Sequence, residues 1–140
     1  MAQIITRYGH FEHVTDPNSE WVTRRLLLEL RSELYDKPDN EHTEVSVGNA
    51  HWTVIAQISG LVICDNVGRP EGFNSNLPET MYLRDIPDAT LVAIWQALVR
   101  EDQAALLSHP WRQLDELPAY SGDYYRRCTC HGCSPPRTDL

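Results

Sequence analysis

Three cysteines and one histidine lie within six residues near the end of the chain, in the run Cys128-Thr-Cys130-His131-Gly-Cys133. Thiolate sulfur and imidazole nitrogen are the ligands that zinc prefers in proteins. Cys130 and Cys133 have the Cys-x-x-Cys spacing of a structural zinc site, and Cys128 or His131 could add a third ligand. The cluster is therefore the first candidate for chemistry in this chain.

The sequence around this cluster gives a zinc site little support. A fourth ligand would have to come from His109, Cys64 or another chain. Zinc domains normally have two separated ligand pairs, and only one pair is well spaced here. Pro135-Pro136 also disfavours the helix that a thioredoxin-type Cys-x-x-Cys needs after it. We expect reduced thiols in an irregular tail, with a zinc-binding module as the alternative.

An excess of carboxylates is the second candidate feature. The chain has 20 acidic and 12 basic residues and a formal net charge of −8. The acids are dense between positions 29 and 44, where only Arg31 and Lys37 oppose them. The alternative is an ordinary solvated face, but an anionic surface also attracts a basic protein. We predict that the partner-binding residues are Glu33, Asp36, Asp39, Glu41, Glu44, Asp65 and Glu71.

Motifs for catalysis or phosphate binding are not found in the sequence. The seven glycines form no phosphate-binding loop, and the serines form no G-x-S-x-G nucleophile elbow. His10 and His13 could pair on a helix, but their segment reads as a loop, so we expect surface histidines. Cys64 lies in an apolar strand and reads as a core residue. We expect a non-enzymatic protein without a cofactor, unless zinc binds the terminal cluster.

Charge and hydropathy also exclude some classes of partner. An acidic chain is poorly suited to direct nucleic-acid binding, which requires a basic surface. No apolar run approaches the roughly 20 residues that span a bilayer. The N-terminus lacks the basic start and apolar centre of a signal peptide. We therefore expect a cytoplasmic protein whose four cysteines are reduced.

Hydrophobic periodicity predicts the elements that carry these residues. Residues 2–8 read as a strand and residues 9–17 as a loop. Asn18 or Ser19 is expected to cap a helix of about 16 residues, because apolar side chains follow at a spacing of four. Those side chains are Val22, Leu26, Leu30 and Leu34, with Leu27 beside them.

The middle of the chain predicts an antiparallel meander. Residues 43–47 and 52–58 alternate apolar and polar side chains, and the turn pairs Gly48-Asn49 and Ser59-Gly60 follow them. Residues 61–64 are apolar on both faces, which is typical of a central strand. After a long loop at 68–78, residues 80–84 favour a fourth meander strand.

Two further helices complete the expected domain. One begins near Asp85 and buries Leu91, Ile94, Trp95 and Leu98, and a short one covers residues 101–107. We predict an α+β fold, with an antiparallel β-meander sheet and two main helices packed on one face. Residues 1–117 would form the single domain, and residues 118–140 an irregular tail that contains the Cys, His and Pro residues.

The layout resembles the small acidic α+β immunity proteins of bacterial toxin systems over roughly residues 18 to 111. The segments that carry the resemblance are Asp39-Asn-Glu-His42, Val45-Ser-Val-Gly-Asn49, Trp52-x-Val54, Ser59-Gly-Leu-Val62, Asp65-Asn66, Leu91-x-x-Ile94-Trp95 and Pro110-Trp111. The resemblance implies a non-catalytic protein that neutralises a toxin by occluding its active site. A basic toxin domain would then be the partner. The alternative is a phage-type acidic inhibitor that mimics nucleic acid.

Overall fold

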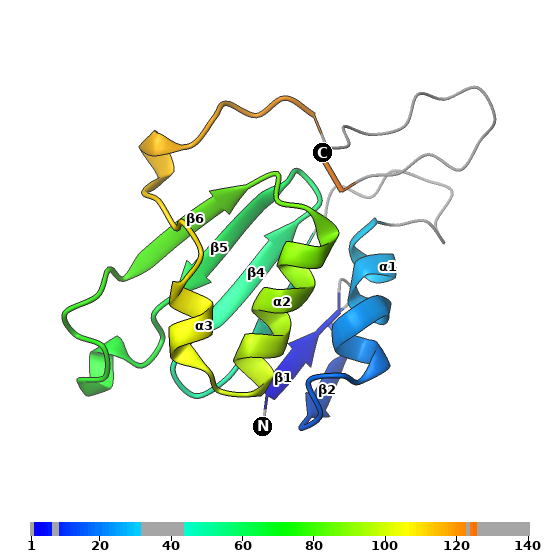
Figure 1. Ribbon diagram of the computed structural model, residues 1–140, viewed down its shortest axis with the longest axis horizontal. Coiled ribbons are helices and arrows are strands. Elements are labelled where there is room, and N and C mark those ends of the chain that lie inside the picture. Colours follow the sequence, from blue (N-terminus) through cyan, green and yellow to red (C-terminus); the bar gives the residue numbers. More distant parts are fainter. Residues whose placement is uncertain (1, 7–8, 32–43, 123, 126–140) are drawn as a thin grey trace.

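The computed structural model describes residues 2–6, 9–31, 44–122 and 124–125. Six strands form one antiparallel sheet in the order β2-β1-β3-β4-β5-β6 (Figure 1). The strands are β1 (Ala2–Ile5), β2 (Phe11–Val14), β3 (Glu44–Gly48), β4 (Thr53–Gln57), β5 (Leu61–Asp65) and β6 (Thr80–Arg84). The helices are α1 (Leu26–Arg31), α2 (Asp88–Val99) and α3 (Gln103–Leu107), with a π-helical turn at Trp21–Arg25 and 3-10 turns at Arg69–Glu71 and Leu114–Glu116.

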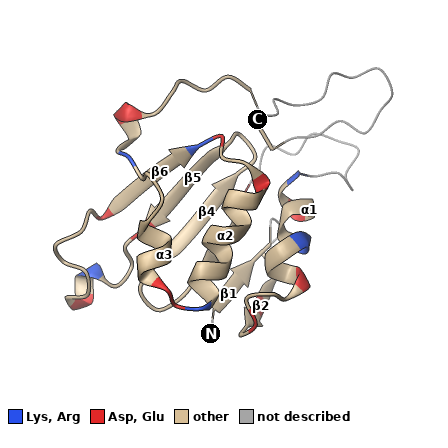
Figure 2. Ribbon diagram, in the orientation of Figure 1, with Lys and Arg blue, Asp and Glu red and all other residues tan. Residues whose placement is uncertain are grey.

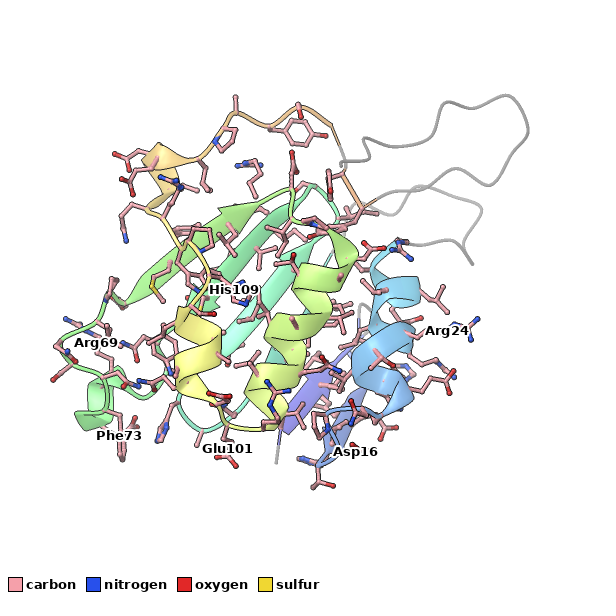
Figure 3. The ribbon with its side chains drawn as sticks, in the orientation of Figure 1. Asp16, Arg24, Arg69, Phe73, Glu101 and His109 are labelled. Atoms are coloured by element: carbon pink, nitrogen blue, oxygen red, sulfur yellow. The ribbon has the colours of Figure 1, made fainter. Side chains whose placement is uncertain are left out.

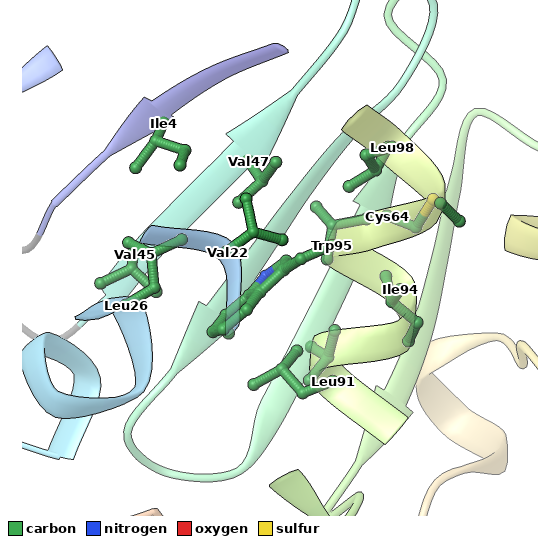
Figure 4. Packing of buried hydrophobic residues seen from close by; sticks show 14 of the residues in the cluster. Ile4, Val22, Leu26, Val45, Val47, Cys64, Leu91, Ile94, Trp95 and Leu98 are labelled. Atoms are coloured by element: carbon green, nitrogen blue, oxygen red, sulfur yellow. The ribbon is translucent and has the colours of Figure 1, made fainter. Parts of the chain in front are cut away.

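The helices α1 and α2 lie against one face of the sheet, so the predicted α+β fold is confirmed. Each meander strand alternates because it points every second side chain toward these helices. The buried residues of β3 to β6 are Val45, Val47, Val54, Ala56, Val62, Cys64, Met81 and Leu83. They pack against Val22 and Leu26 of the first helix and against Leu91, Ile94, Trp95 and Leu98 of α2 (Figure 4).

The opposite face of the sheet is only half-buried. The prediction of a central strand is confirmed for β5, which lies between β4 and β6. Its Val62 and Cys64 are buried, whereas Leu61 and Ile63 are partly exposed. Four consecutive apolar residues cannot distinguish one-sided from two-sided burial, and here the helices cover one side. One row of side chains runs across all six strands on the half-buried face: Phe11, Ile5, Ser46, Ile55, Ile63 and Tyr82.

The N-terminal region differs from the sequence prediction in two ways. Residues 9–17 are not all loop, because Phe11–Val14 pairs with β1 as an edge strand. Apolar and polar residues do not alternate along this strand in the way that predicts one buried face, and Val14 is its only buried residue. The first helix begins with Glu20 as its N-cap, and no side chain caps it. Asn18 and Ser19 therefore do not act as the expected side-chain cap, although the Ser19 carbonyl accepts from the Val22 and Thr23 amides.

The core extends past residue 117, the expected domain end. Tyr125 is fully buried and donates its hydroxyl proton to the Ile86 carbonyl at 2.8 Å. Its amide donates to the Ile58 carbonyl at 3.1 Å, and its ring meets Tyr124 edge-on with centroids 5.1 Å apart. Burial raises the pKa of the Tyr125 phenol above its usual range, so the hydroxyl stays a donor. The C-terminal segment is thus anchored to the sheet at Tyr125.

Replacing Tyr125 should show how much this anchor contributes. Tyr125→Phe should lower the free energy of unfolding by about 1 kcal/mol, because only the hydrogen bond to Ile86 is lost. Tyr125→Ala should cost about 3–5 kcal/mol, because it also empties a large buried volume. Urea denaturation measures both. Leu114→Ala is the control, since Leu114 is 51% exposed; equal effects of Tyr125→Ala and Leu114→Ala would contradict the anchor.

Candidate functional site

A pocket of about 460 Å³ lies where the loop after β5 returns to β6. Its lining residues are Asp65, Asn66, Val67, Arg69, Pro70, Glu79 and Thr80. This volume falls within the usual range of binding pockets, and the lining combines apolar walls with carboxylates. The pocket and the loop beside it are the candidate site.

Backbone hydrogen bonds hold the loop between β5 and β6, both within the loop and to the turn between β3 and β4. The Gly68 amide donates to the His51 carbonyl at 3.1 Å, and the Gly68 carbonyl accepts from Phe73 at 3.0 Å. A 3-10 turn at Arg69–Glu71 lies between Gly68 and Phe73. Gly72 is the C-cap of this turn and has a φ of 95°. Only glycine adopts that left-handed conformation without strain, so Gly72 lets the chain reverse here. The predicted long loop is therefore a folded structure.

Asn66 fastens both ends of this loop. Its backbone amide donates to the Glu79 carbonyl at 2.9 Å. Its side-chain Nδ2 donates to the carbonyls of Asn74 at 3.0 Å and Pro78 at 3.2 Å. Asn66 is only 3% exposed, and within the described part of the chain its Oδ1 accepts no hydrogen bond. One buried amide thus fixes the loop and keeps one acceptor unused.

Two apolar side chains are presented by this loop. Phe73 is 53% exposed and Val67 is 41% exposed. The Phe73 ring lies 4.5 Å from the His51 ring, centroid to centroid, and this contact restricts its rotation. Figure 3 shows Phe73 and Arg69 extending outward from the loop. Exposed aromatic residues on a fixed backbone are typical of protein-binding surfaces.

Carboxylates surround these apolar side chains. We define the loop surface as Asp65, Val67, Arg69, Glu71, Phe73 and Glu79, which includes three acids and one base. The Asp65 Oδ1 accepts from the Thr80 hydroxyl at 3.3 Å, and Glu71 and Glu79 are exposed. The turn after α2 adds Glu101 and Asp102, which line a small neighbouring cavity with His51. The resulting end of the molecule is predominantly acidic (Figure 2).

The three predicted partner-binding residues that the structure describes, Asp65, Glu71 and Glu44, do not all lie together. Asp65 and Glu71 both lie on the loop surface. Glu44 lies on the same sheet face as Asp65 but at its other end, where its Oε1 accepts from Gln57 at 3.3 Å. From the pairing register, Glu44 and Asp65 are roughly 16 Å apart. Four more predicted residues fall outside the described residues, namely Glu33, Asp36, Asp39 and Glu41.

The predicted zinc ligands Cys128, Cys130, His131 and Cys133 also fall outside the described residues. Across the ranges that are described, no three His, Cys, Asp or Glu residues group so that they could hold a metal ion. Cys64, named as a candidate fourth ligand, is fully buried on the helix-covered face of the sheet (Figure 4). His10 and His13 are exposed, as expected.

Sequence reasoning missed Asn66, Phe73 and Glu79 as residues of the site. The sequence placed Asn66 only at the end of a strand. No local pattern predicts its hydrogen bonds to Asn74 and Pro78, which lie 8 and 12 positions further along the chain. Phe73 is one aromatic residue in a polar loop, and its contact with His51 depends on how two separate turns pack. The Gly and Pro residues did correctly locate the loop itself.

Removing the Asn66 side chain should loosen the loop. Asn66→Ala deletes both donors to Asn74 and Pro78, so the Phe73 and Leu77 amides should exchange with solvent at least about 10-fold faster. The free energy of unfolding should fall by about 1–3 kcal/mol. Hydrogen exchange followed by NMR measures the first effect. Asn76→Ala, at an exposed loop position, should change neither quantity, and unchanged exchange in Asn66→Ala would contradict the role of Asn66.

Cys64 should be chemically inert in the folded protein. Burial, and then the nearby Asp65 charge, raises the pKa of its thiol to about 12. At pH 8 only about one thiol in ten thousand is therefore a thiolate, which is the reactive form. Iodoacetamide should label Cys64 at least about 100-fold more slowly in native protein than in urea, as measured by mass spectrometry of its peptide. Rapid native labelling would show that Cys64 is accessible after all.

Comparison with known proteins gives no match to a protein-family model, a curated protein or a solved structure.

Proposed function

We propose that this chain is a non-catalytic protein-binding domain that neutralises a basic toxin domain. The observation that carries the proposal is the loop surface, where Phe73 and Val67 stand exposed among Asp65, Glu71 and Glu79. Protein interfaces commonly combine a few apolar or aromatic anchors with a polar, charged rim. The loop surface has both parts.

Preorganisation of the loop favours tight binding. A flexible loop must lose conformational entropy when it binds, and that loss weakens the complex. Here Asn66 bonds both sides of the loop, and Phe73 rests on His51 before any partner arrives. A partner would therefore meet a surface whose shape is already fixed.

Charge supports a basic partner. The whole chain carries a formal net charge of −8, and the loop surface has three acids against Arg69. Opposite charge accelerates association and disfavours acidic competitors. Toxins that act on nucleic acids need basic clefts to hold the phosphates. An acidic inhibitor can occupy such a cleft, which is the mode of action that the resemblance to immunity proteins implies.

The experiment has to identify the partner and test neutralisation together. A photo-crosslinking phenylalanine analogue at position 73, in the full chain expressed in its native host, should capture a basic protein. That protein, expressed alone in a sensitive host, should stop growth. Co-expression of the unmodified chain should restore growth. Asp65→Lys combined with Glu71→Lys should weaken binding of the purified partner at least about 10-fold at low salt, measured by calorimetry.

Glu12→Lys is the matched control for these charge reversals. Glu12 is exposed on β2, at the sheet edge opposite β6, so its reversal should leave affinity and growth rescue unchanged. A captured protein that is harmless, or whose toxicity the chain does not relieve, would contradict the immunity function. A captured host DNA-binding enzyme would instead favour the nucleic-acid mimic.

A further inference from the structure

We propose that the pocket between Asp65 and Glu79 receives the guanidinium group of an arginine side chain from the partner. This inference rests on the proposed function and specifies how the loop surface recognises a basic protein. The pocket has three classes of lining group, and each matches one part of an arginine side chain.

The carboxylates form the first class. Asp65 ends β5 and Glu79 immediately precedes β6, so paired strands bring two acids to one pocket from separate parts of the chain. Arg69 is the only base among the lining residues, which leaves a formal charge of −1. No ion pair joins Arg69 to either carboxylate in the described part of the chain. Both carboxylates are therefore available to an incoming cation.

The second class is the unused acceptor on Asn66. Asn66 lines the pocket and is only 3% exposed. Its Oδ1 accepts no hydrogen bond from the described residues. A buried acceptor normally has a donor, from protein or from water. Its Nδ2 is already committed to Asn74 and Pro78, so only the oxygen remains for a ligand. Less than 1 Å² of the Oδ1 surface is exposed, so a donor that enters the pocket would satisfy it after a small shift of the pocket wall.

The third class is apolar. Val67 and Pro70 line the same pocket and offer carbon surface beside the carboxylates. An arginine stem packs its methylene groups on such surface while the charged head reaches polar partners. The guanidinium carries five donors in a planar fork, and it can address several acceptors at once. Lysine offers a compact ammonium instead, so a pocket with several acceptors favours arginine.

Binding of a small probe to the full chain tests the pocket without any knowledge of the partner. N-acetyl-arginine amide, titrated at low salt to about 50 mM, should shift the NMR signals of the Val67 and Thr80 amides and the Asn66 side-chain amide saturably. The matching lysine derivative should bind at least about threefold more weakly. Asp65→Asn and Glu79→Gln should each reduce arginine-probe affinity at least about threefold.

Two control variants separate the pocket from general acidity. Asp115 is exposed in the 3-10 turn at Leu114–Glu116 and does not line the pocket, and Glu12 lies on the opposite sheet edge. Asp115→Asn and Glu12→Gln should leave the probe affinity within about twofold. Equal losses in all four variants, no saturable shift, or a response to Ca²⁺ in place of the arginine probe would each overturn the pocket. Backbone spectra confirm that every variant is folded.

The pocket and the proposed function can fail separately. If the probe binds but no toxin is neutralised, the arginine pocket stands and the immunity function is wrong. If a toxin is neutralised through the loop surface but the probe does not bind, the pocket is wrong and the function stands. Once a partner is known, each arginine at its interface can be replaced in turn with lysine. One of these replacements, at the arginine that enters the pocket, should weaken the complex. The same replacement should cause no further loss of affinity when this chain carries Asp65→Asn.

Discussion

One-sided coverage of the sheet is the constraint on which the rest of this structure depends. The helices α1 and α2 pack on a single face, so every strand must divide its residues between a buried and a half-buried side. Trp95 sits at the centre of the buried side, fully enclosed between α2 and the strands (Figure 4). The strict alternation in β3 to β6 fixes the strand register, because a one-residue slip would expose the whole core face.

That fixed register determines where the candidate site lies. Asp65 pairs with Thr80, so the strand residues on either side of the intervening loop are held side by side. Hydrogen bonds from Asn66 then fix the base of the loop, and His51 of the β3–β4 turn contacts Gly68 and Phe73. The same arrangement places a buried polar side chain next to two carboxylates. The rigidity of the loop surface and the chemistry of the pocket thus have one origin, the pairing of β5 with β6.

Regular features of this fold could be predicted from the sequence, and features that depend on distant contacts could not. The alternation of Val45, Val47, Val54 and Ala56 gave the meander directly, and the spacing of Leu91, Ile94, Trp95 and Leu98 gave α2. Tyr125 was missed because a single aromatic residue in an irregular segment has no period. The acidic composition pointed toward Asp65 and Glu71, but the role of Asn66 appears only when the loop has closed.

The half-buried sheet face explains how separated carboxylates can belong to one interface. Ile63 lies two residues before Asp65 on the same face and stands opposite Ile55 and Tyr82. A standard interface buries about 800 Å² on each partner, more than one pocket provides, so a partner that reaches Asp65 would also cover part of this row. Glu44 marks the far end of the same face. Apolar burial in the middle would then supply most of the free energy, while the charges at each end would set the orientation.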